Sequence, residues 1–255
     1  MVVYTQAIVR RPCTNFKDGI TEADLGMPDH QLSLMQHDAY CRALERCGLK
    51  IVQLPPDPGF PDSCFVEDTA VIADGAAVIT RLGHITRRGE EKSIASTLSQ
   101  SKQLLYIKEP GTVDGGDVMR MGDHYIIGLS QRTNSDGARQ LASFLASLGK
   151  SATTVQVERF IHLKTYVSSV EDEILLCLEG YINPDWQKAA KHLISVPPEE
   201  HWAANCLGAN GKVLVPASCP KTSEALEKAG KEVLCLDMSE FQKMDGRLTC
   251  LSILL

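Results

Sequence analysis

The chain alternates strand-like and helix-like segments from one end to the other, and this alternation constrains its fold more than any other feature. Short apolar runs that predict strands are each followed by a polar loop, a stretch of helical periodicity and a second apolar run. The whole unit occurs five times. First strands are predicted at 5–10, 75–81, 124–130, 173–179 and 212–217, helices at 30–48, 89–100, 135–149, 184–193 and 219–230, and second strands at 49–55, 103–110, 153–157, 193–198 and 231–238.

Alternating strands and helices predict an α/β fold, and a single α/β sheet is the plain alternative to a repeat architecture. A doubly wound dinucleotide-binding fold is disfavoured, because no G-x-G-x-x-G follows the first strand. Similar repeated units favour instead a closed ring, in which the loops between strand and helix gather at one end of a central channel. No linker rich in Pro, Gly or Ser interrupts the pattern, so residues 1–255 are predicted to form a single domain.

Composition narrows the functional classes. The formal net charge of -6 disfavours a general nucleic-acid surface, which needs a concentrated basic face, and suits a small cationic substrate better. No signal peptide or membrane-spanning run is recognisable, so a cytoplasmic location is expected. The cysteines, 9 in number and without a C-x-x-C pair, are predicted to be reduced thiols. The histidines lack metal-ligand spacing, so no metal site is expected.

A cysteine near the C-terminus, Cys250, is a candidate for chemistry. It lies between a turn at Asp245 and Gly246 and a final apolar run, in the segment DGRLTCLSILL. Chain ends usually fray, so an end as apolar as this one is expected to be held as a strand. The thiol then lies at the start of that strand, either as a buried packing residue or as a nucleophile.

Acidic side chains gather before a predicted buried strand. In FPDSCFVEDTAV, the carboxylates of Asp62, Glu67 and Asp68 bracket Phe65 and lead directly into the apolar AVIA. Burial of carboxylates is costly unless they meet a cation. A turn that merely begins a strand is the alternative interpretation.

A second acidic loop and one histidine add further candidates. In EPGTVDGGDVM, Asp114 and Asp117 surround two glycines, which permit positive φ and a close approach of the backbone; a hairpin turn is the simpler interpretation. His162 lies between apolar neighbours in RFIHLKTYV. A lone histidine in such a strand is more often a satisfied core residue than a catalytic one.

Two arginines occupy corresponding places in their units. Arg87 in ITRRGE and Arg132 in SQRTNSDG both lie in a loop between strand and helix, although Arg88 competes with Arg87 for this place. Solvated surface side chains are the alternative. In a closed ring, equivalent loops face the same channel, so both guanidinium groups could converge on one carboxylate.

Together these residue types suit attack on a guanidinium carbon. A thiolate is the nucleophile, a histidine transfers protons, carboxylates hold the cation and arginines hold an amino-acid tail. The motifs that carry them resemble the dimethylarginine dimethylaminohydrolase family, of the guanidine-modifying pentein superfamily. They run in order over nearly the whole chain: FPDSCFVED, ITRRGE, TVDGGD, SQRTN, IHLKT, AANC and DGRLTCLSILL. The resemblance implies a five-bladed αβ-propeller of pseudo-repeated ββαβ units.

The resemblance also implies a role for each site residue. Cys250 matches the nucleophile, His162 the general acid and base, and Asp114 the acidic residue that orients the histidine, where some family members have Glu. Among the implied substrate-binding residues, Asp62 and Asp68 bind the guanidinium and amino ends, with Glu67 beside them, and Phe65 lines the side-chain channel. Arg87 and Arg132 bind the α-carboxylate. The backbone carbonyl of Ile20 accepts from the α-amino group, and it belongs to a lid loop that carries Gly19 and Gly26.

The implied activity is hydrolysis of N-omega-methylated arginines to citrulline and dimethylamine or methylamine, through a covalent cysteine S-alkylthiouronium intermediate. It requires no cofactor, and its partner is a small-molecule substrate, with no nucleic acid and no membrane; a homodimer is expected by analogy. Two alternatives stay open. One is an arginine deiminase-like hydrolysis of free arginine to citrulline and ammonia, and the other is a non-catalytic propeller that serves as a binding module.

Overall fold

The computed structural model describes residues 3–171, 174–183 and 190–255, and it arranges the strands in small sheets of three. The sheets are β15-β1-β2 (Ile253–Leu254, Gln6–Arg10, Lys50–Leu54), β3-β4-β5 (Ala70–Ala73, Ala76–Ile79, Gln103–Tyr106), β6-β7-β8 (Val118–Met121, His124–Leu129, Ser151–Gln156), β9-β10-β11 (Val167–Val170, Ile174–Leu178, His192–Val196) and β12-β13-β14 (Leu207–Ala209, Lys212–Pro216, Glu232–Leu236).

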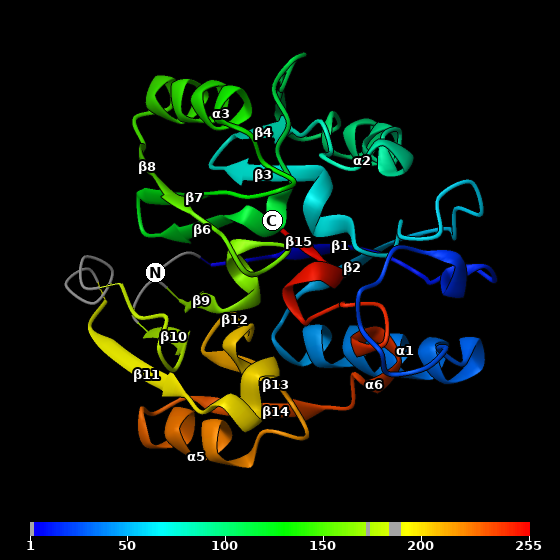
Figure 1. Ribbon diagram of the computed structural model, residues 1–255, viewed down its shortest axis with the longest axis vertical. Coiled ribbons are helices and arrows are strands. Elements are labelled where there is room, and N and C mark those ends of the chain that lie inside the picture. Colours follow the sequence, from blue (N-terminus) through cyan, green and yellow to red (C-terminus); the bar gives the residue numbers. More distant parts are fainter. Residues whose placement is uncertain (1–2, 172–173, 184–189) are drawn as a thin grey trace. The chain divides into compact units, whose positions relative to one another are not determined.

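Every sheet has the same internal order. Its middle strand pairs antiparallel with the first strand and parallel with the third. A parallel pair needs a crossover connection, which is usually a helix. Described helices supply it as α1 (His30–Arg46), α2 (Glu91–Leu98), α3 (Ser135–Ser147) and α5 (Pro220–Lys228), each of which follows the middle strand and precedes the third strand of its sheet in the chain (Figure 1). The predicted ββαβ repeat is therefore confirmed.

The two strands predicted in each repeat are the middle and third strands of these sheets. Most of the strands that precede the middle strands in sheet order were not predicted. The first strands are short, with 4 residues in β6 and in β9 and 3 in β12, so they carry little periodic pattern. The helix predicted at 184–193 falls largely on residues 184–189, which lie outside the described residues. Its last two positions belong to β11, because they pair in parallel with β10.

Other helical elements are short, and they include η1 (Phe16–Asp18), η3 (Ile85–Arg87) and α6 (Ser239–Gln242). The longer helices begin at polar caps: the Asp29 side chain accepts the Leu32 N–H before α1, and the Asn134 side chain accepts the Gly137 N–H before α3. Among the described residues, none of the helices has the length and apolarity that crossing a membrane requires.

The last strand of the chain completes the first sheet. β15 pairs antiparallel with β1, with Leu254 opposite Ala7 and Ile253 opposite Ile8, and in Figure 1 the red β15 lies beside the dark blue β1. The prediction that the apolar end is held as a strand is therefore confirmed. Cys250 lies just before it, in the 3-10 turn η7 (Thr249–Leu251).

A 3-10 turn precedes the first strand of every sheet. The turns η2 (Val66–Thr69), η4 (Gly115–Asp117), η5 (Leu163–Thr165), η6 (Pro198–Ala204) and η7 lead into β3, β6, β9, β12 and β15 in that order. Most of the acidic, histidine and cysteine candidates lie in these turns or directly beside them. The repeat thus places candidate side chains at equivalent points of different sheets.

The chain divides into two compact units, each with its own apolar core. Unit 1 comprises Met1–Phe65 and Tyr166–Leu255, and unit 2 comprises Val66–Thr165. Leu44 lies in the core of unit 1 and Ile127 in that of unit 2, both fully buried. The single domain predicted for the whole chain stays a prediction, and each unit is described by itself below.

Tyr40 ties the segment before β15 to α1, and this contact can be tested. Its buried hydroxyl donates to the carbonyl oxygen of Leu248 at 2.8 Å and lies 2.8 Å from the hydroxyl of Ser252. Tyr40→Phe leaves that buried carbonyl without its donor, so it should lower the free energy of unfolding by about 1–3 kcal/mol in urea titrations. Tyr106→Phe, at a tyrosine of β5 that is 48% exposed, is the matched control. Equal losses in both variants would contradict the anchoring role.

Candidate active site

Two consecutive glycines let turns of unit 2 approach one another. A Cβ on Gly115 would lie 2.0 Å from the carbonyl oxygen of Glu67, and one on Gly116 would lie 2.6 Å from Nδ1 of His162. The Gly116 N–H donates to Oδ1 of Asp68 at 2.9 Å. Neither of these glycines has a positive φ, so the motif TVDGGD uses them for the close approach of backbone and not for a left-handed turn. Any larger residue here would separate η2, η4 and the histidine.

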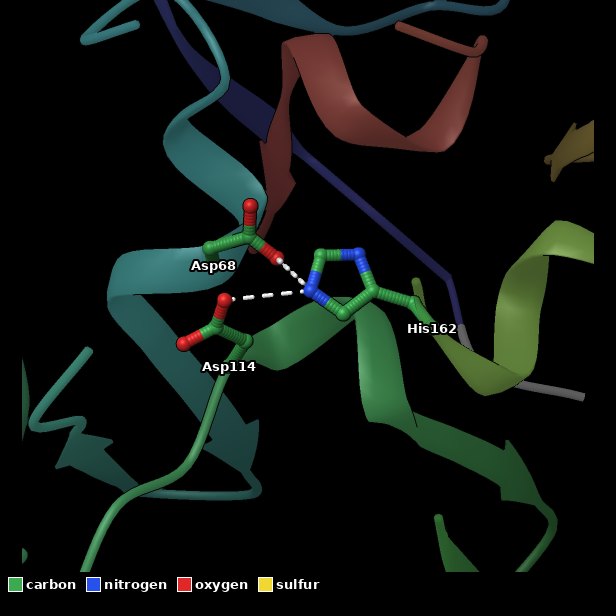
Figure 2. A group of neighbouring side chains, drawn as sticks. All are labelled: Asp68, Asp114 and His162. Atoms are coloured by element: carbon green, nitrogen blue, oxygen red, sulfur yellow. Dashed lines mark hydrogen bonds and ion pairs between the residues drawn. The ribbon is translucent and has the colours of Figure 1, made fainter. Parts of the chain in front are cut away.

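His162 lies beside two buried carboxylates. Its Nε2 is 3.0 Å from Oδ2 of Asp114 and 4.0 Å from Oδ1 of Asp68. Figure 2 shows both carboxylates pointing toward this nitrogen. Asp114 is held in turn by the N–H of Gly83, which donates to its Oδ1 at 2.8 Å. The aspartate at this position therefore reaches the imidazole within hydrogen-bond distance, although it is shorter than glutamate.

The carboxylates control the protonation of this cluster. Burial disfavours the imidazolium, but the nearby carboxylates, led by Asp68, outweigh burial and raise the pKa of His162 to about 9. Burial likewise disfavours the Asp68 carboxylate, yet His162 and Arg87 lower the pKa of Asp68 to about 2. At neutral pH, an imidazolium therefore faces an ionised Asp68.

The same side chains are a possible metal-ligand set. One donor atom each from Asp68, Asp114 and His162 lie within 4.8 Å of one another. However, the guanidinium of Arg87 donates to Oδ2 of Asp68 at 2.7 Å, and a positive charge at that distance repels a cation. The cluster is thus better suited to holding a proton on His162 than to holding a metal ion.

Arg87 is buried among carboxylates of the protein itself. Besides its bond to Asp68, it donates from Nε and Nη2 to Glu90, at 3.0 and 2.9 Å. Burial lowers the pKa of this guanidinium, but Glu90 and Asp68 outweigh burial and raise it. Arg87 is therefore a fixed cation that holds Asp68 in its ionised form.

Arg132 occupies the corresponding loop, as predicted, but has different surroundings. Arg87 lies between β4 and α2, and Arg132 lies between β7 and α3. Nη1 of Arg132 is buried and has no hydrogen-bond partner among the described residues. A Cβ on Gly83 would lie 2.3 Å from the carbonyl oxygen of Arg132, so the glycine lets the two loops touch. Because a buried donor without a partner is costly, this guanidinium is suited to bind the carboxylate of a ligand.

Glu67 is paired with a lysine that was not predicted as a site residue. Its Oε1 lies 2.5 Å from Nζ of Lys164, and both side chains are 13% exposed. Lys164 stands in the same IHLKT motif as His162, and this motif is the sequence signal that could have identified it. A protein cation thus already offsets part of the acidic charge in this cluster.

The turn that carries Cys250 is held from two sides within unit 1. The Asn205 side chain accepts the N–H of Thr249 at 2.9 Å and donates to its hydroxyl at 3.0 Å. On the other side, Tyr40 holds the carbonyl of Leu248. Cys250 itself is half-buried. Asn205 belongs to the AANC motif, and its contacts explain that motif as a clamp on the cysteine turn.

Phe65, Asp62 and Ile20 also lie in unit 1. The ring of Phe65 packs against Phe16, with centroids 5.8 Å apart, and a Cβ on Gly246 would lie 2.3 Å from Cε1 of Phe65. The glycine in the DGRLTC segment therefore makes room for this ring. The Ile20 N–H lies 3.2 Å from both carboxylate oxygens of Asp62, so the start of the predicted lid loop is joined to a predicted substrate-binding carboxylate.

The predicted site residues thus form two groups. Within unit 2, the structure brings four of them into one network of hydrogen bonds and ion pairs: Asp68, Arg87, Asp114 and His162. Glu67 and Arg132 are in the same unit, and Ile20, Asp62, Phe65 and Cys250 are in unit 1. Three supporting residues were not predicted, namely Glu90, Lys164 and Asn205, although each stands inside or directly beside a quoted motif.

Comparison with known proteins agrees with this geometry. The arginine deiminase family profile matches residues 58–187. The chain is 41% identical to an N(G),N(G)-dimethylarginine dimethylaminohydrolase of Pseudomonas aeruginosa, over 98% of this chain and 99% of that protein. It is 36% identical to a dimethylarginine dimethylaminohydrolase of Streptomyces coelicolor, over 97% of this chain and 96% of the relative.

Solved structures agree in fold. A cysteine-to-serine mutant of the Pseudomonas aeruginosa enzyme, complexed with citrulline, matches with a TM-score of 0.96 and 40% identity over 100% of both chains. The N-terminal domain of ArgZ, an arginine dihydrolase from cyanobacteria, matches with a TM-score of 0.85 at 17% identity, which is a likeness of fold alone. The predicted α/β class, a five-bladed αβ-propeller of the pentein type, is confirmed by these matches and by the five sheets. The chain therefore belongs to the dimethylarginine dimethylaminohydrolase family, hydrolases that act on the C–N bonds of guanidino groups.

Proposed function

We propose that the protein hydrolyses asymmetric dimethylarginine and monomethylarginine to citrulline and dimethylamine or methylamine. The observation that carries this proposal is the position of the His162 imidazole, held 3.0 Å from Asp114 and 4.0 Å from Asp68. A protonated imidazole beside fixed carboxylates is the general acid that an amine leaving group needs. The family supports the same reaction, since one relative is solved with citrulline, its expected product.

In the proposed first step, the thiolate of Cys250 adds to the guanidinium carbon of the substrate. His162 then gives its proton to the nitrogen of the departing dimethylamine as the C–N bond breaks. This leaves a covalent S-alkylthiouronium intermediate and a neutral imidazole. A nearby imidazolium and a bound cationic substrate both favour the thiolate over the thiol.

In the second step, the neutral His162 accepts a proton from a water molecule as the water adds to the same carbon. The tetrahedral adduct collapses, the C–S bond breaks, and citrulline leaves with the thiolate of Cys250 restored. Asp114 keeps the imidazole in one orientation through both proton transfers. Asp68 stabilises the imidazolium each time it forms.

The remaining predicted residues would bind the substrate. In this proposal Asp62, Glu67 and Asp68 hold the guanidinium and amino ends, Phe65 lines the side-chain channel, and the carbonyl of Ile20 accepts from the α-amino group. The α-carboxylate is bound by Arg132, which is supported by its buried Nη1 without a partner among the described residues. Arg87 stays a predicted contact of the same carboxylate, and its bonds to Asp68 and Glu90 favour a supporting role.

Free arginine is the second candidate substrate, because the matching family profile is that of arginine deiminase. The same machinery would then release citrulline and ammonia. The cellular setting in this proposal is the cytoplasm, which is supported by the nine free cysteines, none of them in a disulfide.

Product analysis tests the proposed reaction. Purified protein is given asymmetric dimethylarginine and, separately, arginine, and citrulline, dimethylamine and ammonia are quantified. Dimethylamine and citrulline are expected in equal amounts from the methylated substrate, with turnover abolished in Cys250→Ser and kept in Cys235→Ser, which removes an exposed thiol. Citrulline and ammonia formed chiefly from arginine would show that free arginine is the substrate. Unchanged turnover in Cys250→Ser would exclude the mechanism.

The protonation of His162 sets an alkaline limit on activity. Because the pKa of His162 is raised to about 9, the histidine is fully protonated below its ordinary pKa of 6.5, and it loses its proton as the pH rises through about 9. The kcat should therefore fall on the alkaline side near pH 9, and Asp114→Asn, which removes a bond and a charge from the imidazole, should move this limb to lower pH. Asp123→Asn, at an exposed aspartate of unit 2, is the control. A limb that does not move in Asp114→Asn would contradict the assignment.

The role of Arg132 predicts a change in KM. Arg132→Gln removes the charge that binds the α-carboxylate, and hydrogen bonds to charged groups contribute about 1.5–3 kcal/mol, so KM for dimethylarginine should rise about ten- to a hundredfold. The decarboxylated analogue of dimethylarginine should lose far less affinity. Arg139→Gln, at an exposed arginine of α3, is the control. An equal rise in KM for both substrates would show that Arg132 does not bind the carboxylate.

A further inference from the structure

We propose that Asp117, which the mechanism above does not use, is a positioning residue that couples the loop of the catalytic histidine to the loop of the carboxylate-binding arginine. Asp117 is fully buried at the end of η4. One of its oxygens, Oδ1, accepts the backbone N–H of Leu163 at 2.9 Å, and the other, Oδ2, accepts the hydroxyl of Ser130 at 2.6 Å. These two bonds lead to two different loops of unit 2.

The first bond fixes the histidine loop. Leu163 directly follows His162 and begins η5, so the bond from its N–H to Asp117 anchors the backbone immediately beside the imidazole. The space around this bond is closed, because a Cβ on Gly128 would lie 2.9 Å from Oδ1 of Asp117 and 3.0 Å from Cβ of Leu163. Glycine in the middle strand β7 thus allows the carboxylate and the histidine loop to meet.

The second bond fixes the arginine loop, and its neighbours determine which of the two groups donates the proton. The oxygen of Ser130 accepts the backbone N–H of Arg132 at 2.9 Å and that of Thr133 at 3.2 Å. A hydroxyl oxygen has two lone pairs, so both are engaged and its proton must be donated elsewhere. Asp117 receives it. The loop of Arg132 therefore requires a group that only accepts at the position of Oδ2.

The same network returns to the histidine by a second path. The hydroxyl oxygen of Thr133 accepts the N–H of Asp114 at 3.1 Å, and Asp114 is the carboxylate that orients His162. Burial raises the pKa of Asp117 to about 6, so at neutral pH the group is still largely a carboxylate and can accept both bonds. Asp117 positions the site through its bonds to Ser130 and Leu163, and its charge also favours the imidazolium of His162.

The consequence depends on the proposed function: one side chain sets both the acid–base geometry and the recognition of the substrate carboxylate. The sharpest variant is Asp117→Asn, which has the same shape. Its amide can still accept the Leu163 N–H, but its NH2 group then meets a Ser130 oxygen whose lone pairs are engaged. Ser130→Ala is the second variant, and it breaks only the branch to the arginine loop.

The experiment compares kcat/KM for dimethylarginine with kcat/KM for its decarboxylated analogue. Ser130→Ala should lower the ratio of the two about tenfold, because a weakened Arg132 loop matters only for the substrate with a carboxylate. Asp117→Asn should lower the ratio similarly, and Asp117→Ala, which removes both acceptor oxygens, should also lower kcat for the analogue, because the His162 loop then loses its anchor as well. A residue that only stabilised the fold would lower the melting temperature and leave the ratio unchanged.

The matched control is Glu200→Gln, which also replaces a buried carboxylate by a neutral amide of the same shape. Glu200 accepts the N–H of Lys221, and the N–H and hydroxyl of Thr222, at the start of α5, where no predicted site residue lies. It should cost stability without changing the ratio or kcat. If Asp117→Asn changes neither quantity beyond Glu200→Gln, or if Ser130→Ala lowers both substrates equally, the proposal is overturned.

A readout independent of turnover separates this proposal from the proposed function. Amide hydrogen exchange at Leu163 and Arg132 should accelerate at least tenfold in Asp117→Ala, whereas in Asp117→Asn and Ser130→Ala only the exchange at Arg132 should do so. If the unmodified protein turns over neither substrate, the proposed function fails and the exchange rates alone decide the role of Asp117. Unchanged exchange at both amides in Asp117→Ala would overturn it.

Discussion

The contact between Arg87 and Asp68 is the constraint on which the rest of the unit 2 site depends. Both side chains are buried, and a buried ion is tolerated only when it is paired and hydrogen-bonded. With Arg87 on one side and the Gly116 N–H on another, Asp68 remains ionised and can stabilise an imidazolium. Without Arg87, burial would favour the protonated form of Asp68, and His162 would lose the charge that contributes most to raising its pKa. The acid in the proposed reaction thus depends on a cation that need not touch the substrate.

The repeat explains why candidate residues so far apart in the sequence occupy equivalent places in different sheets. Each repeat has a 3-10 turn before its short first strand. Asp68 lies in η2, Asp117 in η4 and Cys250 in η7, and His162 directly precedes η5. Asp68 and Asp117 are buried in their turns. Short first strands, apolar middle strands and helices make the scaffold, and the turns differ in the side chains that they carry.

Much of the scaffold could be predicted from the sequence because its signals are local. The middle strand Ile174–Leu178 is buried throughout and appears as a continuous apolar run, and the helices carry clear end signals such as Asp29 and Asn134. The pairing of Arg87 with Asp68, and the clamp of Asn205 on Thr249, join residues far apart in the chain, so no local pattern reveals them. The two glycines of TVDGGD could be interpreted as a turn or as a close approach, and only the position of His162 distinguishes the two.

The two arginines show that equivalent places in a repeat need not have equivalent chemistry. Arg87 is engaged with Asp68 and Glu90, whereas Nη1 of Arg132 has no partner among the described residues, so Arg132 is the better candidate for the substrate carboxylate. Free and methylated arginine carry the same carboxylate, and therefore this end of the site cannot distinguish them. Any preference for methyl groups must come from the other end of the substrate, around the guanidinium.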